Sequence, residues 1–413
     1  MMKRLMILGA SILQVPAIQK AREMGLYTIA VDYDPNAIGF QYADKNCCIS
    51  TIDVDAVLAE AIRLKIDGIM TLASDMPMVT VATVATELGL SGIDVETAYK
   101  ATNKAKMREV LKQANVPIPE FYIVNTYEEY RRAVDRFRFT KKFIVKPADN
   151  SGSRGIYMVQ SVSEIDKAYK HSKKNSRCGA ILVEEYMEGP EVSVETLTIN
   201  GTTNVLAITD KLTTGFPYFV EMGHSQPTQL NKNVVKNITD VAKAAIKAIG
   251  ITTGPSHTEI IVTKSGAKIV ELGARMGGDN ITTYLVPLST GIDMVKSVIQ
   301  IAIGEKPKLD RLFHKGSAIR YFETELGTLS GIEGIEVVKS IDDVKQVYFT
   351  KRIGDKLGEI YSANDRIGFV IAQAYDTSHA IMSCEKAIDS IRISVTNENY
   401  DNYPNSIHSS KSI

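Results

Sequence analysis

The sequence has few cysteines, no excess of charge of either sign and no long apolar run, and each absence excludes a class of protein. Its four cysteines form no C-x-x-C pair and no disulfide framework, which argues against a zinc site and is typical of thiols in a reducing compartment. Lysine plus arginine and aspartate plus glutamate both total 48, so the formal net charge is zero and no overall charge attracts nucleic acid. No window approaches the roughly 18 apolar residues of a membrane span. We expect a cytoplasmic protein that binds neither nucleic acid nor membrane.

The length of 413 residues is too great for one ordinary core and predicts two or three domains. A hydrophobic fraction of 44% and a charged fraction of 23% are typical of a globular protein. The basic start and the short apolar run at residues 4–10 also resemble a signal peptide. Because a turn and a helical pattern follow, we interpret the run as the first strand of a sheet.

The first 95 residues predict a parallel, doubly wound sheet. Strand-like runs and helical patterns alternate along them, at residues 4–10, 11–25, 27–34, 53–66, 67–73 and 78–89. Gly9 closes the first strand and Asp32 lies near the end of the second, as in dinucleotide-binding domains. The residues after Gly9 do not supply G-x-G-x-x-G, so a nicotinamide-dependent oxidoreductase is poorly supported.

The rest of the chain predicts an α+β region over 96–305, a small C-terminal α+β domain over 306–400 and a flexible polar tail over 401–413. The α+β region opens with a helix-rich link that ends at Pro117. A strong hairpin signal, Asn200-Gly201, joins two of its strands.

The stretch HTEIIVTKSGAKIVELGARMGG predicts a second hairpin with a loop of Lys264, Ser265 and Gly266. In that register Thr263 pairs with Ala267, and Glu259 lies opposite Glu271. Like charges directly opposed on two strands are destabilising unless a cation compensates them. A paired-carboxylate site for Mg²⁺ is one interpretation. A surface hairpin with a register one residue different is the other.

Two further segments each give only weak evidence for nucleotide binding when they are considered alone. KFIVKPADNSGSRGI places Lys146 at a strand end before a loop rich in Gly, Ser and Asn, which can wrap phosphate but is not a Walker A sequence. ILVEEYMEGPE offers Glu184 and nearby backbone to an adenine, and Glu191 to a ribose. An ordinary surface loop and a strand end with solvated glutamates remain the alternatives.

Taken in order, these motifs resemble the ATP-grasp superfamily of carboxylate–amine ligases. A basic helix with Lys104 precedes Lys146 and its loop, and the acid-rich strand end precedes the paired carboxylates and Arg275. The resemblance covers about residues 100–300, and the first domain looks like the one that normally precedes this fold. It implies an ATP-grasp fold over 96–305 with a lid subdomain at about 118–190.

The resemblance also implies the roles of individual residues. ATP would lie between two α+β subdomains with Mg²⁺, for which Mn²⁺ can substitute. Arg275 would stabilise the transferring phosphoryl group. The predicted ligands are, for the metal, Glu259 and Glu271; for the phosphates, Lys104, Lys146 and the loop residues Ser151, Gly152 and Ser153; and for adenosine, Glu184, Glu185, Met187 and Glu191. One position departs from the family, since Gly273 stands where many members carry a metal-binding Asn.

The part of the chain expected to bind the amine acceptor resembles the L-amino acid ligase group, which makes dipeptides and related amides. The segments YFVEMGHSQPTQL and ELGARMGGDNIT carry this likeness. It implies that Glu221 or His224 receives the amine, and that the backbone of Gly277 and Gly278 receives the carboxylate or acyl phosphate. For Lys211 two interpretations stay open, a further cation of the cleft and a solvated side chain.

Small-molecule carboxylate and amine substrates follow from this resemblance, and a homodimer is the default assembly. Two alternatives stay open. One is an ATP-grasp enzyme that acts on a purine-pathway ribotide as a carboxylase or a transformylase-like ligase. The other is an ATP-binding module without turnover.

Overall fold

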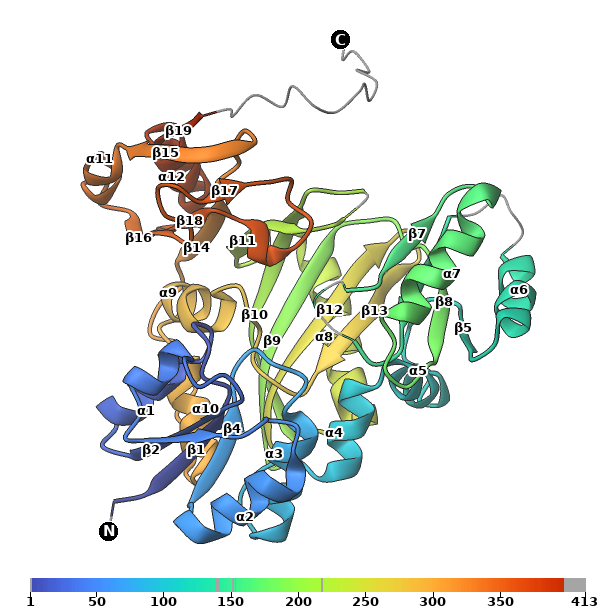
Figure 1. Ribbon diagram of the computed structural model, residues 1–413, viewed down its shortest axis with the longest axis horizontal. Helices are drawn as coiled ribbons and strands as arrows, with labels where there is room; N and C mark the ends of the chain where they lie inside the picture. The colour runs from blue at the N-terminus through green and yellow to red at the C-terminus, as the bar shows by residue number, and fades with distance from the viewer. Residues whose placement is uncertain (1, 138–141, 151, 153, 217, 397–413) are drawn as a thin grey trace.

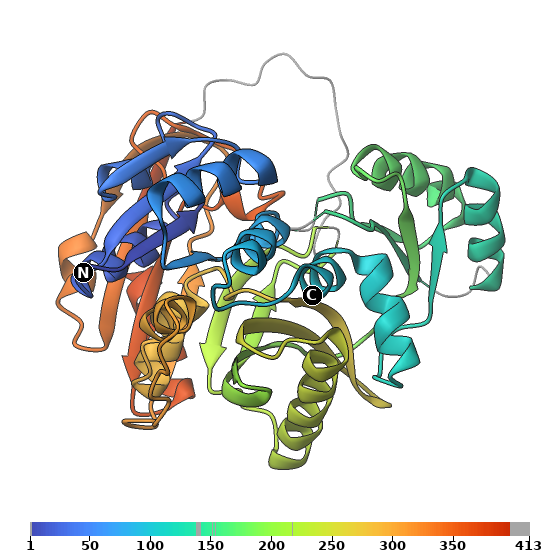
Figure 2. The same cartoon turned by 90° about the horizontal axis from the view of Figure 1, so that it is seen from below.

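The computed structural model describes residues 2–137, 142–150, 152, 154–216 and 218–396. The predicted tail at 401–413 lies outside these residues. Figures 1 and 2 both show the predicted lid subdomain, in green, on one side of the central strands. The N-terminal domain, in blue, and the C-terminal elements, in orange and red, lie on the other side.

The N-terminal domain is a four-stranded parallel sheet in the order β3-β2-β1-β4. Its strands are β1 (Arg4–Leu8), β2 (Tyr27–Asp32), β3 (Lys45–Cys48) and β4 (Gly68–Thr71). Its helices are α1 (Val15–Glu23), α2 (Val54–Leu64) and α3 (Met78–Glu87). Side chains of β1 are buried on both faces, Leu5 and Ile7 in one cluster and Met6 and Leu8 in another, so the doubly wound prediction is confirmed. Strand β3 was not predicted, because KNCC carries no apolar pattern.

Two short helices lead from this domain into the lid subdomain. Asn103 separates α4 (Val95–Thr102) from α5 (Lys104–Gln113), and its side chain caps α5 by accepting from the backbone N–H of Lys106. The lid subdomain is an antiparallel sheet in the order β5-β8-β6-β7 with its own apolar core. Its elements are β5 (Phe121–Val124), α6 (Tyr127–Arg136), β6 (Phe143–Pro147), β7 (Tyr157–Val159), η2 (Val162–Glu164), α7 (Ile165–Lys174) and β8 (Ile181–Glu185).

The central part is an eight-stranded antiparallel sheet in the order β13-β12-β9-β10-β11-β14-β18-β16. Its first five strands in the chain are β9 (Glu191–Ile199), β10 (Thr202–Thr213), β11 (Glu221–Gln226), β12 (Gly254–Thr263) and β13 (Gly266–Gly273). Helix α8 (Lys232–Ile249) packs against β13. Asn200 and Gly201 both have positive φ, 49° and 78°, at the predicted β9–β10 hairpin, which suits a type I′ turn.

The same sheet continues into the C-terminal elements through β14 (Gly316–Tyr321), β16 (Val344–Phe349) and β18 (Gly368–Ala374). Strand β11 pairs with β14, so the sheet crosses the predicted domain boundary at residue 305. The remaining elements are η1 (Ile38–Gln41), η3 (Ile281–Leu285), α9 (Val286–Thr290), α10 (Met294–Ala302), β15 (Gly327–Glu333), α11 (Ile335–Lys339), β17 (Lys356–Leu357), η4 (Ala363–Asp365), α12 (Thr377–Asp389) and β19 (Arg392–Thr396). Helix α10 packs against α1 and β4, which ties the central part to the N-terminal domain.

The β12–β13 hairpin corrects one prediction and confirms another. Thr263 pairs with Gly266, not with Ala267, so the loop has two residues and the predicted three-residue loop is wrong. A bulge next to Glu259 then shifts the register by one residue. Glu259 therefore does lie opposite Glu271, as predicted, because the bulge offsets the change in loop length.

In the described part of the chain, no single helix is both long enough and apolar enough to cross a membrane. One pair bent by 115°, Ile281–Thr290 with Met294–Ala302, meets that test only when its two helices are joined.

Candidate functional site

The predicted site residues gather around the β12–β13 hairpin, between the lid subdomain and the N-terminal domain. Lys104 is the first residue of α5 and is 6% exposed. Its backbone N–H donates to the carbonyl of Ala148 (2.7 Å), and its Nζ donates to Glu271 Oε1 and to the carbonyl of Asn150 (both 2.6 Å). Lys104 thus connects the loop after β6 to one of the two predicted metal ligands.

A buried ionic triad lies beside Lys104. Lys146 Nζ and Arg108 Nε contact the two carboxylate oxygens of Glu184 at 2.7 Å each. Burial by itself raises the pKa of Glu184, but Arg108 and Lys146 together lower it to about 2. Burial lowers the pKa of Lys146. Glu184 thus pairs with the Lys146 ammonium. Its predicted contact with adenosine stays a prediction.

Arg108 was missed by sequence reasoning, although it lies one helical turn after Lys104 and therefore on the same face of α5. Its Nη2 donates to the carbonyl of Val270 (2.7 Å), the residue that the bulge leaves without a partner in the hairpin register. Arg108 therefore holds both the bulge that aligns Glu259 with Glu271 and the carboxylate that contacts Lys146.

A small pocket lies between the loop after β6 and the β12–β13 hairpin. It is lined by Lys104, Lys146, Pro147, Asn150, Gly152, Arg154, Ile156 and Glu271. These include three of the residues predicted to contact phosphate and one predicted metal ligand. Two further predictions, Ser151 and Ser153, lie outside the described residues.

The predicted adenosine segment follows β8. Glu185 pairs with Lys268 (3.0 Å), Met187 is buried, and Glu191 pairs with Lys211 (2.6 Å). Gly189 has φ 150°, and a Cβ there would lie 2.0 Å from the carbonyl oxygen of Val262. Only glycine therefore permits the close approach of this segment to β12.

The side chain of Lys211 is 4% exposed, so Lys211 is a buried cation and not a solvated side chain. Its Nζ lies 2.6 Å from Glu191, 3.2 Å from Glu259 and 3.5 Å from Glu221. Burial alone would lower the pKa of Lys211, but the three carboxylates raise it well above its usual range. This lysine is what allows three acidic side chains to share one corner of the sheet.

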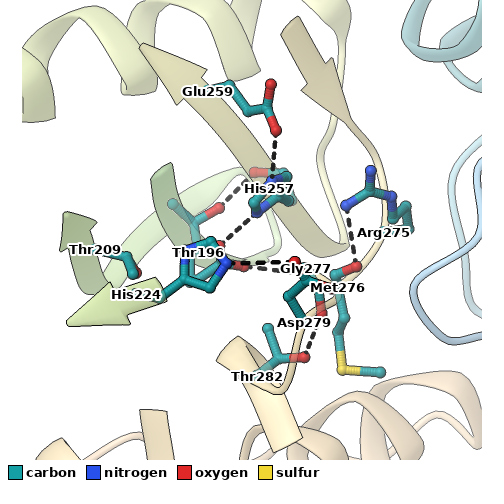
Figure 3. Close-up of polar contacts among 12 residues, drawn as sticks. Thr196, Thr209, His224, His257, Glu259, Arg275, Met276, Gly277, Asp279 and Thr282 are labelled. Atoms are coloured by element: carbon teal, nitrogen blue, oxygen red, sulfur yellow. Dashed lines mark hydrogen bonds and ion pairs between the residues drawn. The ribbon is translucent and has the colours of Figure 1, made fainter. Parts of the chain in front are cut away.

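His257 and Glu195 extend this network, and sequence reasoning missed both. His257 Nδ1 lies 2.5 Å from Glu195 Oε1, and Nε2 lies 3.4 Å from Glu259 Oε1 (Figure 3). Burial opposes the charge on His257, yet Glu195 and Glu259 raise its pKa to about 9. The signal in the sequence was a charged residue, Glu195, in the middle of the strand-like segment EVSVETL.

The predicted catalytic Arg275 forms a two-point ion pair with Asp75 of the N-terminal domain. Its Nε and Nη2 lie 2.9 Å and 3.0 Å from the two carboxylate oxygens. Burial by itself raises the pKa of Asp75, but Arg275, with smaller contributions from Lys104 and His257, holds it below its usual range. A Cβ at Gly273 would lie 2.8 Å from Asp75 Oδ1. The departure at Gly273 thus leaves room for Asp75, which no sequence pattern marked.

The turn after Arg275 joins the predicted substrate residues to the C-terminal elements. The backbone N–H of Gly277 donates to Glu195 (3.3 Å), and a Cβ at Gly278 would meet only Ala73. His224 Nε2 lies 3.4 Å from Asp279 Oδ2, and Arg366 grips both oxygens of Asp279 at 2.9 and 2.8 Å. Sequence reasoning missed Asp279 and Arg366.

The donor set fits Mg²⁺ at the paired carboxylates. Glu259 and Glu271 offer hard oxygen ligands from opposed positions, and each already lies beside a lysine ammonium. The described residues contain no group of three His, Cys, Asp or Glu side chains arranged for a metal ion. A bound Mg²⁺ would therefore need phosphate or water oxygens in addition.

The N-terminal domain gives no support to a dinucleotide site. Asp32, placed where a ribose-binding acid would lie, accepts from the backbone N–H of Ala10 (2.7 Å) and is 9% exposed. Its carboxylate closes the turn after β1.

Comparison with known proteins identifies two parts of the chain. The family model of an ATP-grasp domain matches residues 139–283, and that of an L-amino acid ligase C-terminal domain 2 matches residues 320–396. The chain is 28% identical over 392 residues to an uncharacterized protein, y4rH, of Sinorhizobium fredii, a match that covers 92% of this chain and 80% of that protein.

Two named proteins are also similar. The L-arginine-specific L-amino acid ligase of Bacillus subtilis is 26% identical over 305 residues, which are 71% of this chain and 72% of that ligase. The crystal structure of an L-amino acid ligase from Bacillus licheniformis superposes with a TM-score of 0.82 at 25% identity. That superposition covers 96% of this chain and 99% of the other.

Proposed function

The chain belongs to the ATP-grasp superfamily and carries an L-amino acid ligase C-terminal domain, and from this premise we propose that it joins the carboxylate of an amino acid to an amine at the expense of ATP. ATP-grasp proteins bind ATP with Mg²⁺, and ligases of this family act on small molecules. The proposal adds the reaction and the residues that carry it out.

The proposed reaction has two steps. The substrate carboxylate attacks the γ-phosphate of ATP, which gives an acyl phosphate and ADP. An amine then attacks the acyl carbon and inorganic phosphate leaves. The first step is needed because a carboxylate oxygen is a poor leaving group in water, whereas phosphate is a good one. The protein contributes mainly positioning and neutralisation of charge.

The observation that carries the proposal is the meeting of three cations from three separate segments. Lys104, Lys146 and Arg275 come from α5, β6 and the turn after β13, and they pair with Glu271, Glu184 and Asp75, respectively. We assign Lys104 and Lys146 to the phosphates, and Arg275 to the charge that develops on the transferring phosphoryl group. A triphosphate would exchange the carboxylates now paired with these cations for its own oxygens.

Mg²⁺, when bound, supplies charge neutralisation and a fixed geometry for the phosphate oxygens. Glu259 and Glu271 would hold it. Lys211 would then keep Glu259 in place without occupying its remaining oxygen, since the ammonium contacts only Oε1 of Glu259 among the described contacts. The backbone at Gly277 and Gly278 is assigned to the substrate carboxylate, and Glu221 and His224 to the amine.

The experiment that tests this function is Mg²⁺-dependent phosphate release from ATP against a matrix of the proteinogenic amino acids, singly and in pairs, with mass spectrometry of the products. We expect release that requires an amino acid and a product mass equal to the pair minus one water. If no amino acid or pair causes phosphate release although ATP still binds, amino acid ligation is rejected. That result would direct the search to ribotide substrates or to a module without turnover.

A further inference from the structure

One ring nitrogen of His224 has no hydrogen-bond partner in the part of the chain that the structure describes. Its side chain is 1% exposed. Its Nδ1 has no hydrogen-bond partner among the described residues, whereas its Nε2 faces Asp279 Oδ2 at 3.4 Å (Figure 3). A buried polar atom is costly to leave unpaired, and a substrate group that reaches Nδ1 would remove this cost by pairing with it.

Asp279 fixes which nitrogen of His224 carries the proton. Burial by itself raises the pKa of Asp279, but Arg366 and His224 hold it far below its usual range, so the carboxyl is ionised and only accepts hydrogen bonds. In neutral His224 the Nε2 must therefore be the donor. The lone pair is left on Nδ1, the nitrogen without a partner.

Asp279 itself is held firmly. It lies in the left-handed region with φ 50°, as does Asn280 with φ 62°, which is uncommon for residues other than glycine. Arg366 grips both of its oxygens and also donates to the backbone carbonyl of Glu221 on β11, the strand that carries His224. The guanidinium lies over the ring of Tyr321 at 3.7 Å. One arginine thus fixes both sides of the His224–Asp279 pair.

The position of this pair suits the second step of the proposed reaction. Asp279 and Arg275 lie at the two ends of one turn, with Gly277 and Gly278 between them. The two glycines assigned to the substrate carboxylate are followed directly by Asp279, the partner of His224. An amino acid carries a protonated amine at neutral pH, and it must lose a proton to attack.

We propose that His224 is the general base of amide formation, with Asp279 and Arg366 as positioning residues, an inference that rests on the proposed ligase function. The amine nitrogen forms a bond to the acyl carbon, and the bond from that carbon to the phosphate oxygen breaks. The electron pair of that bond leaves with inorganic phosphate. One proton of the substrate ammonium moves to Nδ1 of His224, a second goes to the departing phosphate, and Asp279 stabilises the imidazolium that results.

The first test needs no substrate. In protein labelled with ¹⁵N-histidine, the six imidazoles are resolved by their nitrogen chemical shifts and His224 is assigned by its loss in His224→Asn. In the neutral form of His224 we expect the proton on Nε2, and a shift toward the other tautomer in Asp279→Asn. A neutral His224 with its proton on Nδ1 in the wild-type protein would overturn the proposal, because Nδ1 would then have no lone pair to accept a proton.

The second test separates the two chemical steps for the amino acid pair found in the matrix experiment. Hydroxylamine is largely unprotonated at neutral pH and traps acyl phosphates as hydroxamates without a base. In His224→Asn we expect amide formation to fall by about a hundredfold or more, the range of a general base, while hydroxamate formation falls less than tenfold. Equal losses in both assays would assign His224 to structure or binding and overturn the proposal.

Two further variants complete the design. Arg366→Lys keeps the charge but not the two-point grip, so it should lower amide formation more than hydroxamate formation, and less severely than Arg366→Ala. His314→Asn, at an exposed histidine, is the matched control and should change neither assay. If the wild-type protein itself makes no hydroxamate from any amino acid, the ligase function fails, and the tautomer measurement still decides the geometry.

Discussion

At the scale of single residues, the paired carboxylates are the sharpest chemical feature of the cleft. Glu259 and Glu271 are compensated by different lysines, Lys211 and Lys104, which come from a strand and a helix on opposite sides of the hairpin. Two cations brought to one pair of anions show how strongly the fold must neutralise this position. A divalent ion with a triphosphate would satisfy the same need.

Replacing Glu271 by Gln should therefore weaken Mg²⁺-dependent turnover while the fold remains intact. The change removes one charge from the metal pair and leaves an amide of nearly the same shape. We expect the Mg²⁺ concentration for half-maximal activity to rise by about tenfold or more, the size of a lost charged ligand. Glu336→Gln, at a side chain that is 84% exposed, is the control. Unchanged activity at limiting Mg²⁺ would reject Glu271 as a ligand.

Glu184 gives a second prediction, on stability against pH. Its pKa is about 2 in the folded protein, below the ordinary 4.5. A carboxyl with a lowered folded pKa stabilises fully above its unfolded value, and the contribution is lost as the pH falls from about 4.5 toward 2. The difference corresponds to on the order of 3 kcal/mol in the free energy of unfolding.

The measurement is the free energy of unfolding of the wild type and of Glu184→Gln, from denaturant titrations at several pH values. The variant should be less stable at neutral pH, because Arg108 and Lys146 lose their shared anion. The gap between the two proteins should narrow as the pH falls below about 4.5. A gap that stays constant down to about pH 2 would contradict the assignment of the ion triad.

At the scale of elements, the turn from Ala274 to Asp279 sets the geometry of the cleft, and its two glycines should differ. A Cβ at Gly277 would lie 2.7 Å from His257 Nδ1 and 2.9 Å from the Glu195 carboxylate. A Cβ at Gly278 would meet only Ala73 at 3.6 Å, an ordinary contact. Gly277→Ala should therefore lower the free energy of unfolding by about 1–3 kcal/mol and reduce turnover. Gly278→Ala should have the smaller effect in both measurements, and equal effects would contradict this reading of the turn.

The sequence predicted elements where apolar periodicity is strong, and failed where polar residues fill a strand. Strand β11, with the sequence EMGHSQ, is buried along most of its length but has no apolar alternation. Its inward positions are polar because they take part in specific contacts. Gln226, for example, donates to Thr209 and accepts from Ser289. A buried strand with many polar residues is therefore difficult to find from hydrophobic pattern alone.

The same limit applies to the site. Lys104, Lys146, Glu259, Glu271 and Arg275 could be named because each belongs to a short motif whose order along the chain is informative. Their partners could not, because pairing across the chain leaves no local pattern. The partners revealed only by the fold are Asp75, Arg108, Glu195, His257, Asp279 and Arg366. The hairpin shows a related limit, since the carbonyl of its bulged residue, Val270, accepts a hydrogen bond from Arg108, which is distant in the sequence.

At the scale of the whole molecule, the cleft is assembled by every part of the chain that the structure describes. The lid subdomain contributes Lys146 and Glu184, the N-terminal domain contributes Asp75, and the C-terminal elements contribute Arg366. Asp75 and Arg366 each bind one end of the turn after β13. The N-terminal and C-terminal parts thus each hold one end of this turn. We therefore expect changes in either part to alter turnover.

The ion pair between Asp75 and Arg275 offers the clearest test of that coupling. Asp75→Asn removes the anion that orients the guanidinium, so turnover should fall while ATP affinity changes little, as expected for a group that works chiefly in the transition state. Arg275→Ala should lower turnover further. If Asp75 acts only through Arg275, adding Asp75→Asn to Arg275→Ala should cause no additional loss, because the residue to be positioned is already absent. Additive losses in the double variant would assign Asp75 an independent role, and a loss confined to ATP binding would move Arg275 from the reaction step to ground-state recognition.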